Sequence, residues 1–191
     1  SVASYLLGSI PFGIIFSKLF KLGNLSEIGS GNIGATNVLR TGNKFLALLT
    51  LLLDLLKGYF PVVITAQYFP QYVFLASLIV FLGHIFPIWL KFKGGKGVAV
   101  YIGILLAYNF PVSLVFLFVW AFIAIIFKYS SLSALSASMM ALNIFIFTND
   151  PQLKIFILIT VLIFLKHYNN IQLSSTYPTG ISLGISSPLS R

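Results

Sequence analysis

Two glycine-rich polar segments stand out in a chain that is otherwise mostly apolar. The first covers residues 29–40 and reads GSGNIGATNVLR, and the second covers residues 91–97 and reads KFKGGKG. Because glycine has no Cβ, its backbone amide can come close to a ligand, and successive amides can together hold an anion. Hydroxyl and amide side chains add donors, and arginine and lysine add positive charge. Both segments therefore predict a site for an anionic ligand, and we expect that ligand to be phosphorylated.

The first segment also matches the pattern G-x-G-x-x-G, with Asp54 twenty residues after Gly34. This pattern indicates a dinucleotide site only when it follows a β-strand. Here it follows an apolar run of helix length, so we disfavour a nucleotide. A flexible loop is the other alternative, but the density of polar groups favours a phosphate or polar-headgroup site. The polar candidates are Ser30, Asn32, Thr36, Asn37 and Arg40.

The second segment lacks the order of residues that a Walker A loop requires. Lys91 and Lys93 serve equally well as anchors that orient the chain in a membrane. Lys96 differs because glycines flank it and a predicted helix begins just after it, where backbone amides favour an anion. We therefore interpret Lys96 as a ligand-binding residue. The other candidates in this segment are Lys93, Gly94, Gly95 and Gly97.

Four further titratable residues interrupt or end apolar runs. Asp54 and Lys57 share one helix face, where they neutralise each other or support the site. His84 lies within an apolar run, which favours a packed side chain over a catalyst. His167 ends the last apolar run, where it marks the interface or acts as a base, since an unperturbed pKa near ~6.5 suits proton transfer.

Several other chemistries find no support in the composition. The chain has no cysteine, which excludes disulfides and thiol catalysis. With two histidines and three acidic residues it shows no ligand spacing typical of a metal site. A Ser-His-Asp triad lacks an acid near the predicted site, because Glu27 is the lone candidate. We therefore expect neither a metal nor another cofactor.

The composition is that of a membrane protein. Of the 191 residues 58% are hydrophobic and 8% are charged, whereas soluble domains carry about 25% charged residues. The net charge of +9 lies in short clusters between apolar runs. This pattern favours a membrane surface and small anionic molecules over nucleic acid, and the orientation of the chain in the membrane explains part of it.

We predict an all-α integral membrane protein with seven transmembrane helices. A spanning helix needs about 20 mostly apolar residues. The predicted spans are residues 1–22, with a Gly-Pro interruption, and 44–69, 71–90, 98–109, 111–127, 132–148 and 152–167. The fourth is short, so we expect its helix to begin within the preceding glycine run.

The basic residues predict the orientation of the chain. With the N-terminus outside and the C-terminus cytoplasmic, ten cations fall on the cytoplasmic side and one loop cation falls outside, which follows the positive-inside rule. The cytoplasmic ten are Lys18, Lys21, Arg40, Lys44, Lys91, Lys93, Lys96, Lys128, Lys166 and Arg191, and the one outside is Lys154. Both glycine-rich segments and His167 then share the cytoplasmic face.

The order of the motifs resembles a known family, the bacterial PlsY-type acyl-phosphate:glycerol-3-phosphate acyltransferases. The resemblance covers about residues 5–171 in the correct order. The motifs that carry it are residues 5–13, 29–40, 54–58, 83–87, 92–98, 129–132 and 167–171. Outside them, the turn after the fifth span has Ala134 where the family usually has a serine, and we expect Ser133 to replace it.

The resemblance implies a seven-span enzyme of the bacterial plasma membrane with a cytoplasmic active site. It implies transfer of a fatty acyl group from acyl phosphate to the 1-hydroxyl of glycerol 3-phosphate, giving lysophosphatidate for phospholipid synthesis without a metal. It assigns catalysis to Ser30, Lys96, His167 and Asn170. It assigns substrate binding to Asn32, Thr36, Asn37, Arg40, Lys93, Gly94, Gly95, Gly97 and Ser133.

Acyl phosphate is already an activated mixed anhydride, so the predicted reaction needs no enzyme nucleophile. Binding two anionic substrates side by side lowers the entropic barrier, and the same donors stabilise charge on the acyl oxygen. The hydroxyl proton goes to a substrate phosphate or to His167. We favour the phosphate, with His167 mainly positioning the substrate.

Residues 1–171 form a single predicted membrane domain, and we expect residues 172–191 to be an atypical, disordered tail. A transporter or channel for phosphorylated metabolites is the alternative function, but it requires cations near the middle of the membrane. A non-catalytic lipid-binding subunit is a third. The sequence favours no particular oligomer.

Overall fold

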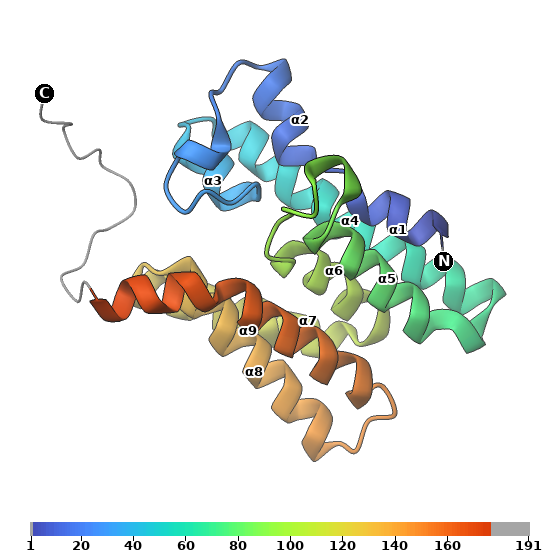
Figure 1. Cartoon of the computed structure of the whole chain (residues 1–191). Coiled ribbons are helices and arrows are strands. Elements are labelled where there is room, and N and C mark those ends of the chain that lie inside the picture. The colour runs from blue at the N-terminus through green and yellow to red at the C-terminus, as the bar shows by residue number, and fades with distance from the viewer. Residues whose placement is uncertain (1, 177–191) are drawn as a thin grey trace, which may run out of the picture.

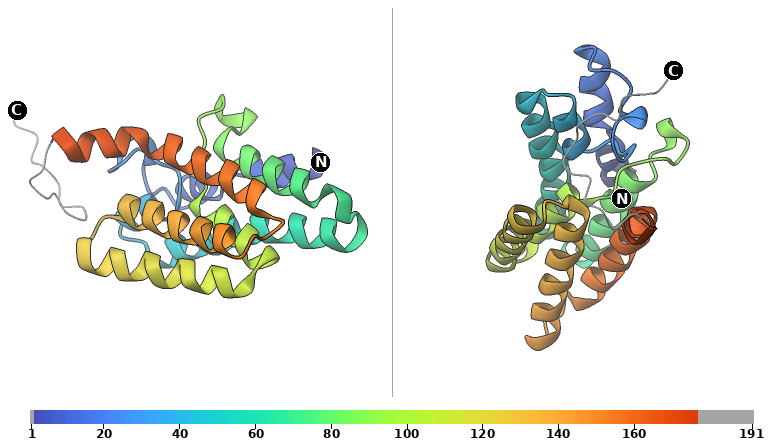
Figure 2. Two further views of the ribbon diagram at one scale, coloured as in Figure 1. Left: turned by 90° about the horizontal axis from the view of Figure 1, so that it is seen from below. Right: turned by 90° about the vertical axis from the view of Figure 1, so that its left-hand side faces the viewer.

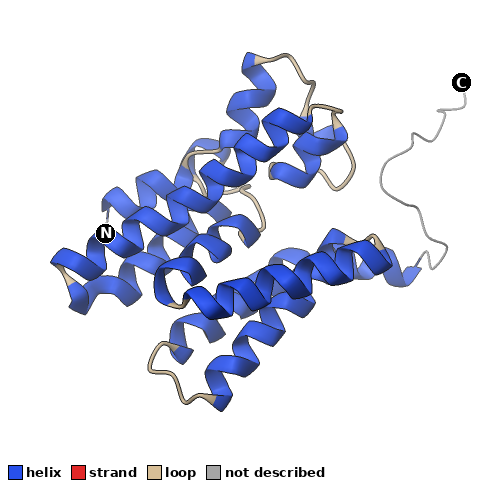
Figure 3. Ribbon diagram, turned by 180° about the vertical axis from the view of Figure 1, so that it is seen from behind, coloured by secondary structure: helices blue, strands red, loops and turns tan. Residues whose placement is uncertain are grey.

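A computed structural model describes the backbone of residues 2–176 and the side chains of residues 2–168. The described chain is helical and contains no strand (Figure 1 and Figure 3). Its α-helices are α1 (Val2–Ser9), α2 (Phe12–Leu19), α3 (Ala35–Arg40), α4 (Lys44–Tyr68), α5 (Val73–Ile85), α6 (Val98–Tyr108), α7 (Phe110–Phe127), α8 (Ser130–Phe147) and α9 (Leu153–Thr176). Short 3-10 turns are η1 (Leu25–Glu27), η2 (Pro70–Tyr72) and η3 (Ile88–Leu90). Residues 177–191, which include most of the predicted tail and Arg191, lie outside the described residues.

Four helical stretches within the described residues are long and apolar enough to cross a bilayer. They are α4, residues 70–90, α7 and α8, and the pair α1 and α2, bent by 41°, adds a fifth if it is one span. The 11-residue α6 is too short to cross alone, since it is only about 17 Å long. Length and composition therefore support four to five spans of the seven that the sequence predicts.

The start of α6 corrects one expectation. The helix begins at Val98, after the glycine run and not within it. Gly97 has φ +86°, a left-handed conformation, so the right-handed helix cannot extend back through this residue. Other helix boundaries follow familiar caps. The Asn43 side chain accepts a hydrogen bond from the backbone N–H of Leu46 at 3.0 Å, and this caps α4.

Glycines allow close packing between helices of the first half of the chain. A methyl group at Gly58 of α4 would overlap the Val100 carbonyl of α6, and one at Gly103 of α6 would overlap the Leu55 carbonyl of α4. Gly8 of α1 lies equally close to Val80 of α5. Small residues at such crossings let backbones approach within a membrane, where van der Waals contact drives association.

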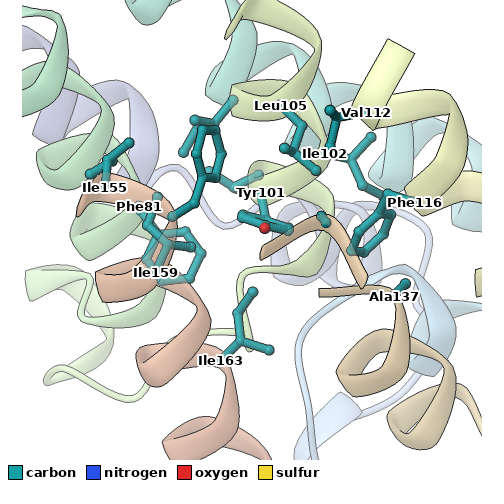
Figure 4. Packing of buried hydrophobic residues seen from close by; sticks show 14 of the residues in the cluster. Phe81, Tyr101, Ile102, Leu105, Val112, Phe116, Ala137, Ile155, Ile159 and Ile163 are labelled. Carbon is teal, nitrogen blue, oxygen red and sulfur yellow. The ribbon is translucent and has the colours of Figure 1, made fainter. Parts of the chain in front are cut away.

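The main core centres on α6 and α9. The buried Tyr101 ring makes edge-on contacts with Phe116 and Phe156, and Phe156 stacks on Phe145 with ring centroids 4.2 Å apart. Figure 4 shows Phe81, Ile159 and Ile163 around the same ring. This core joins α5, α6, α7, α8 and α9, so α9 is held against the helices that carry the second glycine-rich segment.

The two ends of the bundle differ in what they carry. Figure 1 and the left view of Figure 2 place α3, the turn between α7 and α8, and the C-terminal end of α9 toward one end. The N-terminal end of α1 and the turn between α4 and α5 lie toward the other. We call the first the basic end, because it holds Arg40, Lys128 and Lys166. The charge pattern predicts that these three cations share one side of the membrane.

Candidate active site at the basic end

The first glycine-rich segment combines left-handed turns with a close approach to α2. Gly29 and Gly31 have φ values of +53° and +65°, which favour glycine. A methyl group at Gly13 of α2 would overlap the carbonyl of Ile33, so the segment passes directly over α2. Beneath it lies a small separate core formed by Leu25, Val38, Leu46 and Ala47.

Asn37 holds this segment together. Its buried amide donates to the backbone carbonyls of Leu25 and Ile28, each at 2.7 Å. Its Oδ1 accepts a hydrogen bond of 3.0 Å from Nη1 of Arg40. The Arg40 side chain also packs against Gly29, where a Cβ would overlap the guanidinium. Asn37 therefore fixes the direction of an exposed guanidinium at the end of α3.

The second glycine-rich segment packs onto the C-terminal end of α5. The amides of Gly94 and Gly95 donate to the carbonyls of Ile85 and His84 at 3.3 Å and 3.1 Å. A methyl group at Gly94 would overlap backbone atoms of the same turn, and one at Gly95 would overlap the His84 ring. These bonds satisfy the free carbonyls at the end of α5. They also bring the two backbones so close that no space remains for a Cβ at Gly94 or Gly95.

Lys96 follows this packed segment directly and lies within electrostatic range of Arg40. Its side chain is half-buried. Burial first, and then the positive charge of Arg40, lower the pKa of the Lys96 ammonium from 10.5 to about 8. Two cations from separate segments thus repel each other in the free protein. A doubly negative phosphate between them would relieve this repulsion.

His167 lies within electrostatic range of Lys96. Its ring is buried, and its Nδ1 lies 2.8 Å from the carbonyl of Ile163. Because a carbonyl only accepts, Nδ1 carries a proton and the neutral ring keeps the Nε2 lone pair. The charge of Lys96 acts on this ring. The structure therefore brings Arg40, Lys96 and His167 together from three separate parts of the chain. The side chain of Asn170 lies outside the described residues.

The remaining predicted site residues take varied positions. Ser30 and Lys93 are exposed, and Thr36 is half-buried in the first turn of α3. Asn32 is half-buried and accepts a hydrogen bond from the N–H of Ile33 at 2.9 Å. Ser133 is fully buried in α8, where its hydroxyl donates to the carbonyl of Tyr129 at 2.8 Å.

Three side chains that the sequence did not single out as site residues hold the turn after α5. Lys166 of α9 donates to the Ile85 carbonyl at 2.9 Å and lies over the Phe86 ring. The hydroxyl of Tyr5 donates to the Phe86 carbonyl at 2.8 Å. Trp89 donates from its indole nitrogen to Ser9 at 2.8 Å. The position of Lys166 next to His167 in sequence was the one available signal.

Asp54 and Lys57 form a buried ion pair on α4, with 2.7 Å between Oδ1 and Nζ. Nδ1 of His84 lies 3.9 Å from the same carboxylate. Within residues 2–168, no three side chains of the types that bind metals gather closely enough to hold an ion.

These features define a class: a membrane protein that is helical throughout its described residues, with cations from two glycine-rich segments toward one end. The model of the family described as "Glycerol-3-phosphate acyltransferase" matches residues 1–175. The glycerol-3-phosphate acyltransferase of Pelagibacter ubique (strain HTCC1062) is 53% identical over 173 residues, which cover 90% of each chain. That of Mesorhizobium japonicum is 50% identical over 171 residues, covering 89% of this chain and 88% of the relative.

Solved structures give the same result. The crystal structure of PlsY in its glycerol 3-phosphate form is similar with a TM-score of 0.89 and 36% identity, covering 96% of this chain and 93% of that one. The lysophosphatidic acid form of PlsY has a TM-score of 0.83 at 36% identity, covering 91% and 88%. The chain belongs to the glycerol-3-phosphate acyltransferase family.

Proposed function

We propose that this protein transfers a fatty acyl group from acyl phosphate to the 1-hydroxyl of glycerol 3-phosphate. The products are lysophosphatidate and inorganic phosphate, and the reaction serves phospholipid synthesis. The electrostatic proximity of Arg40 and Lys96 carries this proposal, since two cations within range of each other suit two phosphorylated reactants. Family membership and the two PlsY structures, one named for glycerol 3-phosphate and one for lysophosphatidic acid, support it.

In the proposed reaction the hydroxyl oxygen attacks the acyl carbon, and the bond from that carbon to the phosphate oxygen breaks. Lys96 and Arg40 neutralise the phosphates, while Ser30, Asn32 and Thr36 add donors. Gly94 and Gly95 act through Lys96, because their amides donate to the carbonyls of Ile85 and His84 and so fix the backbone that carries it. Asn37 acts through Arg40, because its own polar atoms hold the first segment.

We propose that the departing phosphate accepts the hydroxyl proton and that His167 positions the substrate together with Asn170. The buried His167 ring, fixed by its bond to Ile163, presents Nε2 as an acceptor for a substrate hydroxyl. The variant His167→Gln tests this assignment. Turnover near that of the parent protein would exclude His167 as an essential base, whereas a loss of at least 100-fold in kcat with KM unchanged would contradict a positioning role.

We also propose seven spans in a bacterial plasma membrane, with the N-terminus outside and the active site cytoplasmic. The helices α6 and α9 would be the sixth and seventh spans, and other helices of the bundle would surround them. The clustering of cations at the basic end supports this orientation. Accessibility of single cysteines, introduced at Lys128 and Lys154, to a membrane-impermeant reagent in intact cells measures it.

The function is tested with purified protein in phospholipid vesicles. Phosphate release from acyl phosphate should require glycerol 3-phosphate, and lysophosphatidate should form in equal amount. Uptake of glycerol 3-phosphate without phosphate release would favour a transporter. Binding without either would favour a lipid-binding subunit.

A further inference from the structure

A buried polar cluster lies beside the proposed site without belonging to it. It consists of Asp54 and Lys57 on α4 and His84 on α5, with exposed fractions of 3%, 5% and 6%. Ionisable groups inside apolar helices are costly to bury, and removing one partner leaves the other uncompensated. Each end of the cluster contacts a neighbour that holds one of the two glycine-rich segments.

One end of the cluster reaches the first segment through α2. The ammonium of Lys57 donates to the carbonyl of Ile10 at 2.6 Å, at the break between α1 and α2. This bond satisfies a carbonyl that the break leaves without a helical partner, so it fixes the direction in which α2 departs. In turn, α2 holds the first segment through the contact of Gly13 with the Ile33 carbonyl. The hydroxyl of Ser17 adds a bond to the Gly23 carbonyl.

The other end of the cluster reaches the second segment through His84. Its Nδ1 lies 3.9 Å from the Asp54 carboxylate, which faces the ring from α4. Its Nε2 side lies against Gly95, where no Cβ fits. The His84 carbonyl also accepts the N–H of Gly95 at 3.1 Å. Ring and backbone of one residue therefore set the position of Gly95, and Lys96 follows it directly.

We propose that Asp54, Lys57 and His84 are positioning residues that fix the spacing between the two glycine-rich segments, and thereby between Arg40 and Lys96. They act through α2 and Gly95 and not by contact with a substrate. The proposal deepens the proposed function, on which its kinetic test rests. Since a misplacement of about 1 Å can cost about 100-fold in rate, this spacing determines whether two anionic reactants meet productively.

A distance measurement tests the cluster without any assay of activity. The chain has no cysteine, so spin labels can be placed at Leu39→Cys and Phe92→Cys, whose side chains are 46% and 58% exposed. Pulsed EPR on the doubly labelled protein in vesicles should give a narrow distance distribution. Asp54→Asn and Lys57→Gln should broaden or shift it. Thr50→Val is the control, because the Thr50 hydroxyl bonds only within α4, to the Leu46 carbonyl. Folded variants with the parent distribution would overturn the proposal.

If the charge variants fail to fold, two substitutions that compensate for each other provide a second test of the proposal. Gly95→Ala pushes a methyl group into the His84 ring, and His84→Ala removes the ring that seats Gly95. Each single variant should lower kcat/KM by about 100-fold. The double variant should recover at least tenfold, because the shortened side chain makes room for the methyl group. Parent-like kinetics in His84→Ala, or losses that multiply in the double variant, would overturn the proposal. An inactive parent protein would refute the proposed function, while the label distances would still decide the role of the cluster.

Discussion

The two glycine-rich segments are similar in composition and differ in how the fold uses them. The first is exposed at both ends, and its glycines supply left-handed turns and room for the Arg40 side chain. Its own Asn37 provides most of its cohesion. The second is pressed against the end of α5, with Gly95 and Gly97 buried. There glycine is required because neighbouring atoms leave no space for a Cβ.

This contrast indicates a division of labour. The exposed ends of the first segment, which carry Ser30 and Arg40, can adjust to a ligand at little cost. A segment packed against a helix end holds its cation, Lys96, on a fixed backbone, which is what electrostatic stabilisation of a transition state requires. We therefore expect the second segment to dominate catalysis and the first to dominate binding.

The largest effect should come from removing the charge of the fixed segment. We expect Lys96→Met to lower kcat by about 100- to 1,000-fold, the usual cost of deleting one preorganised donor. Lys91→Met, a nearby exposed cation outside the proposed site, should change it less than about threefold. Steady-state phosphate release in vesicles measures both. Equal losses in the two variants would mean that general positive potential, and not placement, is responsible.

The next effect concerns space for a Cβ. Gly94→Ala should cost about 1–3 kcal/mol of folding free energy, because the methyl group meets the backbone of His84 and Ile85. Gly34→Ala in the first segment should cost no more than about 1 kcal/mol, since its nearest neighbour is the Asn32 amide at 3.5 Å. Thermal unfolding in one detergent compares the two. A larger loss in Gly34→Ala would reverse the contrast.

A more local effect is expected at Asn37. In Asn37→Asp the amide that donates to the carbonyls of Leu25 and Ile28 becomes an acceptor, so each carbonyl loses one hydrogen bond and faces a carboxylate oxygen, which costs about 1–3 kcal/mol. Hydrogen exchange should accelerate in residues 25–31 and stay unchanged in the second segment. The KM for the phosphorylated substrate should rise more than kcat falls. Unchanged exchange would show that the segment is held by other contacts.

The smallest effect is a dependence on pH. The pKa of Lys96 is lowered to about 8, so its charge is complete at lower pH and is lost as pH rises through 8. Affinity for a phosphorylated substrate should therefore fall above pH 8, by up to about tenfold per pH unit. Lys96→Arg keeps its charge throughout this range and should flatten the profile. A KM in the parent protein that stays constant from pH 7 to 9.5 would contradict the assignment.

The sequence predicts those features of the fold and the site that depend on residues close together in the chain. Apolar runs predict the helices, because burial in lipid needs about 20 residues regardless of their neighbours. The positive φ of Gly97 delays α6 to Val98, which no hydropathy pattern reveals. The sequence predicts that Arg40 and Lys96 share a face, since alternating spans place both loops on one side.

Roles that depend on distant contacts were not predictable. From the sequence, Asn37 is predicted to bind a ligand. Its hydrogen bonds to the carbonyls of Leu25 and Ile28 form only when the chain folds back on itself. The contact of Lys166 with the Ile85 carbonyl joins residues 81 positions apart. His84 has the same limitation, because its neighbours Asp54 and Gly95 come from two other parts of the chain.

The central claim is that Arg40 and Lys96 act on one pair of phosphorylated reactants. A double-mutant cycle with Arg40→Gln and Lys96→Met, measured as kcat/KM for phosphate release, tests it most directly. The account predicts that the double variant loses little more than the more damaging single variant, because either loss already prevents the reactants from being held together. Losses that multiply across the two sites would contradict the account.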